Sequence, residues 1–223
     1  MSERDRGRRG HVRINEEYAI VLDYLPYGNP YSNRQSPTPI IQAMGEFYFT
    51  LFEAAPGPAL GQVKPGERIY VGPDVSYNYI RVDGIISYDD LTPAAKKTLD
   101  EVLDNLIKQR EKDFVNFLNN SSPITTRLHQ LELIPGIGKK IMWKALDERK
   151  MAPFQSFEDF EKRVGVKNVA QAIKKRIIEE MQGKDNFRLF VRYYRRPVTR
   201  RLSARQASSN RSACALTSVR KRF

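Results

Sequence analysis

LELIPGIGKK, residues 131–140, is the stretch that decides how the C-terminal half of this chain folds. A leucine-rich segment is followed by a turn, Pro-Gly-Ile-Gly at 135–138, and two lysines come immediately after it at 139–140. Proline and closely spaced glycines mark the ends of helices, so the pattern predicts two helices joined by a tight turn.

The composition of this turn is typical of a phosphate-binding site. Glycine at 136 and 138 permits positive φ angles and leaves the backbone N–H groups of the turn facing outward. Together with the unpaired N–H groups of the next helix they form an anion site, which a phosphate usually occupies. Lysines in a first helical turn oppose the helix dipole unless an external anion neutralises them. The predicted nucleic-acid-binding residues are Pro135, Gly136, Ile137, Gly138, Lys139, Lys140 and Lys144.

A simpler interpretation of the same residues is a tight helix–helix turn with two solvated lysines. For two glycines alone that interpretation is preferable. Here the apolar flank, the proline, Gly-Ile-Gly and the basic residues occur together, and the combination favours phosphate binding.

The positive charge of the chain is concentrated at its ends. The formal net charge is +12, and residues 187–223 hold 11 Arg and Lys but no Asp or Glu. Residues 14–90 carry 4 basic and 10 acidic residues, whereas residues 124–182 carry 12 basic and 8 acidic ones. Because a basic surface attracts polyanions, the ends and the segment around the turn are the expected contacts for nucleic acid.

The first half of the chain predicts a small β domain. Four apolar runs alternate with loops rich in Pro, Gly and Asn, and the second run is long enough for two strands or for one bent at Gly45. Four to five short strands in this length favour a small antiparallel barrel over a sandwich. The four runs are EYAIVLDYL, PIIQAMGEFYFTLFEA, GERIYVG and YIRVDGIISY.

The periodicity becomes helical after residue 90. Thr92 followed by Pro93 marks a helix start, and one apolar face continues to Asn120, which predicts a single long helix. Thr125 or Thr126 is expected to cap a short helix before the turn. Helices are then expected at 139–150, after Ser156 and after Asn168.

The predicted fold class is therefore α+β, a small antiparallel β-barrel followed by an all-helical domain. The predicted parts are a disordered basic arm at 1–13, the barrel at 14–90, a linking helix at 91–123, the helical domain at 124–186 and an Arg-rich extended or disordered tail at 187–223. The sequence leaves open whether residues 195–223 are functional or a non-native extension.

LELIPGIGKKIMWKAL resembles a helix-hairpin-helix motif, whose hairpin amides hold nucleic-acid backbones without reading sequence. That resemblance also implies that a monovalent cation is possible at the hairpin carbonyls; no other cofactor and no metal is expected. The following PFQSFEDFEKRVGVKNVAQAI is similar to a second hairpin, but Lys167 stands where the second glycine belongs. The second hairpin is therefore expected to be structural.

The order of these segments over roughly residues 14–194 resembles one archaeal family, a domain of unknown function (number six hundred and fifty-five) predicted to bind nucleic acid. The resemblance implies that the barrel is OB-like, which the strand count permits. In such a barrel the loop after the first strand is a common contact for single strands. Here that loop offers Tyr27, Tyr31 and Arg34 as candidate contacts, although the acidic surroundings favour simple packing of the tyrosines.

Other features favour structural roles. Trp143 is expected to pack against the long helix or the barrel; the alternative is that it borders the bound backbone. The run Lys174-Lys175-Arg176 is expected to be a solvated helix face; the alternative is that it broadens the nucleic-acid footprint. We find no nucleophile elbow, Walker loop or zinc spacing, so no catalytic residue is assigned and the chain is not expected to be an enzyme.

The sequence predicts a non-catalytic, cytoplasmic protein that holds the phosphate backbone of DNA or RNA without sequence preference. The alternative is a protein–protein adaptor in archaeal information processing, with ribosomal or repair proteins as partners; an auxiliary subunit of an enzyme is a weaker option. The choice between DNA and RNA, between single and double strands, the oligomeric state and the pathway stay open. No membrane association is expected, because no stretch approaches the ~20 apolar residues of a membrane span.

Overall fold

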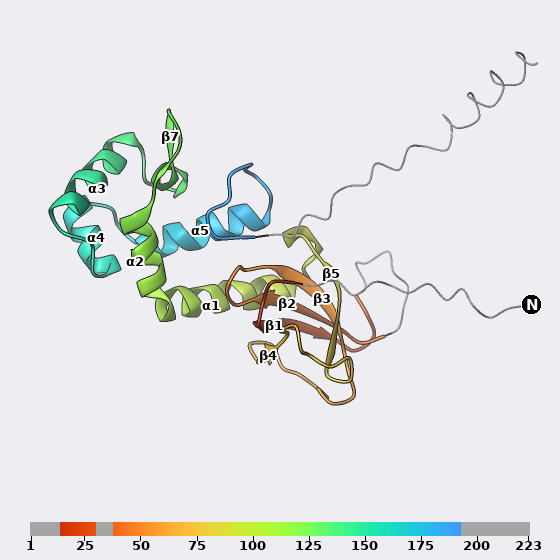
Figure 1. Ribbon diagram of the computed structural model, residues 1–223. Coiled ribbons are helices and arrows are strands. Elements are labelled where there is room, and N and C mark those ends of the chain that lie inside the picture. Colours follow the sequence, from red (N-terminus) through yellow and green to blue (C-terminus); the bar gives the residue numbers. More distant parts are fainter. Residues whose placement is uncertain (1–13, 30–37, 193–223) are drawn as a thin grey trace, which may run out of the picture. The chain divides into compact units, whose positions relative to one another are not determined.

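The structure is a computed structural model that describes residues 14–29 and 38–192. Within these ranges the fold combines an antiparallel five-stranded sheet, a two-stranded ribbon and five α-helices (Figure 1). The predicted α+β class is therefore confirmed.

All four apolar runs of the first half form strands, and the long second run forms two of them. The β2–β3 turn falls after Gly45, where the sequence predicted a bend. The strands are β1 (Tyr18–Leu25), β2 (Ile40–Gly45), β3 (Leu51–Pro56), β4 (Arg68–Tyr70) and β5 (Ile80–Ile85). Their order in the sheet is β4-β1-β2-β3-β5, and every neighbouring pair is antiparallel.

The sheet does not close into the barrel that the sequence predicted. Within the described residues β4 and β5 are its two edges and pair only with β1 and β3. Since β1 and β3 run in the same direction, β4 and β5 also run in the same direction. A three-residue β4 offers few groups for closure, and strand count carries no information on such a long-range pairing.

Both faces of the sheet are buried. Ile41 and Ala43 of β2 belong to an apolar cluster formed within the β domain. Met44 and Leu51, in contrast, belong to a cluster that continues through helix α1 (Pro93–Gln109) into the remaining helices. The alternation of strand side chains thus joins the sheet to the helical part through one continuous core.

The predicted single helix from Pro93 to Asn120 is in fact two helices. α1 begins as predicted, because the Thr92 hydroxyl accepts a hydrogen bond from the Ala95 N–H. It ends at Gln109 with Arg110 as its C-cap, and α2 (Glu111–Asn120) starts immediately afterwards in a new direction (Figure 1). The Arg110 guanidinium donates hydrogen bonds to the carbonyls of Glu46 and Phe47 in the β2–β3 turn. No proline or glycine marks this break. It coincides with the tertiary contact that Arg110 makes with the β2–β3 turn.

The segment before the hairpin also differs from the prediction. Thr125 does not cap a helix; it ends strand β6 (Pro123–Thr125), which pairs with β7 (Leu128–His129). A one-turn 3-10 helix, η2 (Gln130–Leu133), follows. The remaining helices are α3 (Lys139–Met151), α4 (Phe157–Val164) and α5 (Val169–Met181), close to their predicted positions.

A strap formed by residues 187–192 runs from α5 back to the sheet. The fully buried Glu180 carboxylate accepts the N–H groups of Leu189, Phe190 and Val191 and the Nε–H of Arg176. At the far end of the strap, the backbone of Arg192 bonds to Tyr48 and Thr50. The strap therefore fastens α5 to the β2–β3 turn.

No helix in the part of the chain that the structure describes is long and apolar enough to cross a membrane.

Candidate nucleic-acid interface

The predicted hairpin is formed by η2, the 134–138 turn and α3. Gly136 has φ +89°, a conformation that favours glycine, as the sequence predicted. Gly138 has φ −83° and ψ 174°, so it does not use the positive φ that glycine permits, and its backbone is open to any residue. A Cβ at either glycine would meet no atom within 4 Å. Neither conformation nor internal packing therefore requires glycine at 138.

The unpaired amides lie slightly later in the sequence than the predicted ones, which were those of the turn at 136–138. The Ile137 N–H donates to the Ile134 carbonyl at 3.0 Å, and the Ile137 side chain is buried in the core. Ile137 thus anchors the turn and cannot offer its amide to a ligand. The first intrahelical bond joins the Met142 N–H to the Gly138 carbonyl at 2.8 Å. The unpaired donors of the helix start are those of residues 138–141.

The start of α3 differs from those of the other four α-helices in the described ranges. α1 is capped by Thr92 and α4 by Ser156, while α2 has Glu111 and Asp113 in its first turn. α5 is capped by the Glu161 carboxylate, which accepts the Val169 N–H at 2.7 Å. α3 has neither a capping side chain nor an acidic residue in its first turn. Its positive dipole end is left to solvent or to an external anion.

The exposed face of α3 is basic and carries one large aromatic side chain. Lys139, Lys140 and Lys144 are exposed, and Trp143 between them is 60% exposed. The prediction that Trp143 packs against the helix or barrel is therefore wrong. The opposite face of α3 enters the core as predicted, through Ile141, Met142, Ala145 and Leu146.

Lys144 extends from the first hairpin toward the second. Its ammonium lies 3.7 Å from the position that a Cβ would take on Gly165, the residue that ends α4 with φ +84°. Val166 of this second turn is buried, and Lys167 is exposed where the motif would have glycine. The second hairpin is thus present as a turn between α4 and α5, with its amide at Val169 already bonded to Glu161.

Only Lys175 of the basic run in α5 is exposed as predicted; its two neighbours are buried. Lys174 is buried, and its ammonium forms ion pairs with Asp100 at 2.9 Å and Asp104 at 2.8 Å on α1. Arg176 is buried against Glu180 and Asp185. Both cations hold α5 in place and are not available to a polyanion. This pairing could not be predicted from the sequence, because Asp100 and Asp104 lie about seventy residues earlier.

His129 supports the helix that leads into the hairpin. It is buried, and its Nδ1 accepts a hydrogen bond from the Leu131 N–H at 3.1 Å. Burial lowers the pKa of the His129 imidazole below its ordinary value, and the nearby Arg149 lowers it further. The folded state therefore holds this side chain neutral, with Nδ1 as the acceptor.

This arrangement predicts a pH dependence of stability. The unfolded chain protonates His129 near pH 6.5, whereas the folded chain resists protonation. The contribution of the neutral imidazole is therefore fully present above about pH 6.5 and is lost as the pH falls below it. Denaturant titrations between pH 7.5 and pH 5 should give a decline in unfolding free energy that is smaller in His129→Asn, because asparagine caps without titrating in this range. An identical decline in both proteins would contradict the assignment.

The structure offers little support for the second set of predicted nucleic-acid contacts, those in the loop after β1. Tyr27 is 87% exposed after β1, whereas Tyr31 and Arg34 lie outside the described residues. β1 packs on β2, β4 and α1, while α3 packs on η2 and α4, so the two candidate sites lie on elements with different neighbours.

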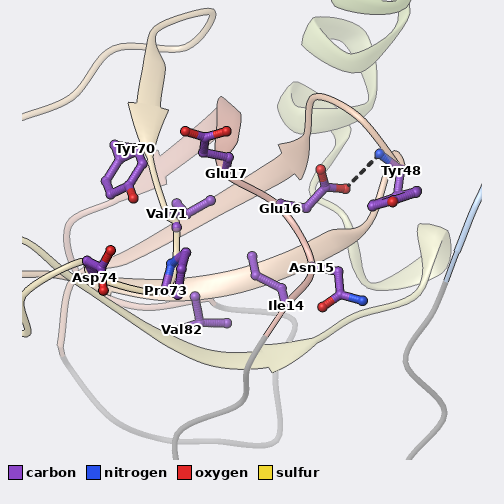
Figure 2. A pocket seen from close by; sticks show the side chains of 11 residues that line it. Ile14, Asn15, Glu16, Glu17, Tyr48, Tyr70, Val71, Pro73, Asp74 and Val82 are labelled. Atoms are coloured by element: carbon purple, nitrogen blue, oxygen red, sulfur yellow. Dashed lines mark hydrogen bonds between the residues drawn. The ribbon is translucent and has the colours of Figure 1, made fainter.

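A pocket of about 670 Å³ lies on the sheet and has the opposite character to the hairpin. Figure 2 shows Glu17 and Asp74 around it together with Tyr48 and Tyr70. Glu16 is buried at its edge and accepts N–H groups of the β2–β3 turn, including that of Tyr48 at 3.0 Å. Burial raises the pKa of Glu16, against the effect of these hydrogen bonds. The carboxylates repel phosphate, and together with the phenol rings they suit a basic ligand.

The fold and the hairpin define a mixed α+β protein in which one helix of a helical hairpin starts without a cap. Comparison with known proteins places the chain more closely: residues 15–192 match the family described as "Protein of unknown function (DUF655)". The chain belongs to this family, so the family membership predicted from its sequence is confirmed.

Two relatives are archaeal. The uncharacterized protein MJ0038 of Methanocaldococcus jannaschii is 46% identical over 180 residues, which are 80% of this chain and 81% of the relative. The crystal structure of Af1531 from Archaeoglobus fulgidus is 42% identical and has a TM-score of 0.68, covering 79% of this chain and 100% of that chain. The match leaves out the ends of this chain, where most of its positive charge lies.

Proposed function

We propose that this protein is a non-catalytic nucleic-acid-binding protein that holds the phosphate backbone at the start of α3. A phosphate oxygen accepts hydrogen bonds from the unpaired amides of residues 138–141, and Lys139 and Lys140 supply the charge. The observation that carries the proposal is the uncapped, basic N-terminus of α3, when every other α-helix in the described ranges begins with a cap or an acid. Such a helix start is a general anion site.

Two glycines strengthen the proposal. Gly138 is exposed and has no internal reason to be glycine, which suits close approach of a backbone from outside. Gly136 shapes the turn through its positive φ. In this proposal the hairpin is a helix-hairpin-helix motif whose first helix is shortened to η2. The contacts are to phosphate, so binding is largely independent of sequence. The OB-like description of the sheet is not needed for it.

The salt dependence of binding tests this proposal. Each phosphate contact that a lysine makes contributes about 0.7–0.9 to the slope of log K against log salt. We expect Lys139→Ala/Lys140→Ala to reduce the slope by about 1.4–1.8 on labelled DNA or RNA, measured by fluorescence anisotropy on the full chain. Lys97→Ala/Lys112→Ala, two exposed lysines on α1 and α2, is the matched control and keeps the wild-type slope. Equal slopes in both variants would place the contacts elsewhere, for example in the basic ends.

A second candidate function is a protein–protein adaptor. The acidic pocket formed around Glu17 and Asp74 favours it, because a basic peptide complements these carboxylates. The two functions are compatible, since the pocket and the hairpin lie on different elements. Glu17→Gln/Asp74→Asn distinguishes them: it weakens capture of a basic partner and leaves nucleic-acid binding through α3 unchanged.

A further inference from the structure

Trp143 is the only tryptophan of the chain and lies on the surface beside the proposed phosphate site. It is four residues after Lys139, which places it about 6 Å further along the helix axis, on the exposed face. Its ring contributes to neither apolar cluster of the described residues. Because the residue is 60% exposed between lysines, burial in the core does not account for this large ring.

The two hairpins are not equivalent as anion sites. At α3 the amides of the first turn are unpaired, whereas at α5 the Glu161 carboxylate occupies the Val169 amide. A phosphate at α5 would have to displace that carboxylate and would be repelled by its charge. The helical part therefore offers one phosphate-binding helix start, enough for one strand but not for a symmetric grip on both strands of a duplex.

Stacking on Trp143 requires the face of a base. In a duplex the base faces are covered by neighbouring base pairs, so an indole on the protein surface cannot reach them. In a single strand a base can leave its neighbours and stack on an aromatic ring, an interaction that tolerates any base. Lys144, held beside Gly165, adds positive charge along the same face.

Building on the proposed function, we propose that the site takes single-stranded nucleic acid, with a phosphate at the start of α3 and an adjacent unpaired base stacked on Trp143. The phosphate contact supplies affinity for any nucleic acid, and the indole selects unpaired over paired strands. This assigns the substrate class of the hairpin and gives Trp143 its role.

The test compares Trp143→Ala with wild type on two probes, an unstructured oligo(U) or oligo(dT) strand and a relaxed, covalently closed circular duplex, which has no ends. We expect the variant to bind the single strand about ten- to a hundredfold more weakly and the duplex within about twofold of wild type. Trp143→Phe should recover most of the loss. Met151→Ala, which removes an 86% exposed apolar side chain at the other end of α3, should bind both probes as wild type does. Alanine is a good helix former, and circular dichroism checks the fold.

Intrinsic fluorescence gives a second, independent readout, because the chain contains a single tryptophan. Saturation with the single strand should quench it, and the duplex should not. If the strand binds without quenching, or if Trp143→Ala weakens both probes equally, the single-strand inference is wrong. Either result leaves the proposed phosphate site intact, because that site is tested separately by the effect of Lys139→Ala/Lys140→Ala on the salt dependence of binding. Absence of binding to every probe would overturn the proposed function itself and this inference with it.

Discussion

Glu180→Ala is expected to lower the free energy of unfolding by about 3–5 kcal/mol, the largest stability effect that the structure predicts. The Glu180 carboxylate is completely buried and accepts four hydrogen bonds, from Arg176 and from three consecutive N–H groups of the strap. Its removal leaves one buried and two partly buried amides without an acceptor and leaves Arg176 with less negative charge around it. For a domain with a total stability of about 5–15 kcal/mol, this loss is a large fraction.

Urea denaturation followed by circular dichroism measures the effect. Glu179→Ala is the matched control on the same helix, because its partly exposed side chain takes no part in this network, and its cost should stay within about 0.5 kcal/mol. Glu180→Gln should fall between the two, since the amide retains one acceptor oxygen but presents a donor to other donors. Equal stability of Glu180→Ala and Glu179→Ala would show that the strap contributes little to the fold.

The hairpin could be predicted from the sequence because its determinants are local. Pro135 and the positive φ of Gly136 act within a few residues, and the apolar face of α3 follows from helical periodicity alone. Thr92 before Pro93 likewise defined the start of α1. In each case the information lies within one turn of helix, the range over which local signals are reliable.

The features that escaped prediction depend on partners distant in sequence. The break at Arg110 accompanies contacts with carbonyls more than sixty residues away. Lys174 is buried because Asp100 and Asp104 neutralise it from another helix. A basic run looks the same in the sequence whether it is solvated or paired, so only the tertiary structure separates the two cases.

The candidate site in the structure also differs in part from the one predicted from the sequence. The sequence predicted the turn at 135–138 but assigned to phosphate binding an amide of Ile137 that the fold uses internally. It also favoured packing of Trp143 against the long helix or the barrel over a position beside the bound backbone, whereas the structure leaves the ring exposed beside the lysines. The two glycines of the turn also have different roles. One glycine is required by backbone geometry and the other, Gly138, is not.

Gly138→Asp is expected to reduce nucleic-acid binding at least about tenfold while leaving the protein as stable as wild type or slightly more so. Asp at this N-cap position can accept the amides of residues 140 and 141, which favours the helix by a few tenths of a kcal/mol over glycine. The backbone at 138 accepts any residue, and the new side chain meets open space. The same carboxylate occupies the phosphate site and repels the phosphate. Loss of even one charge-assisted hydrogen bond, about 1.5–3 kcal/mol, accounts for a tenfold effect.

The most direct measurement pairs the affinity and the unfolding free energy of wild type, Gly138→Asn and Gly138→Asp. Asparagine caps the helix with a neutral group of the same size, so affinity should fall in the order wild type, Asn, Asp while stability does not fall. A loss of affinity without a loss of stability separates binding from folding, because a damaged hairpin would lower both the affinity and the unfolding free energy. If Gly138→Asp is stable and binds single-stranded and double-stranded nucleic acid as tightly as wild type, the start of α3 is not the phosphate site.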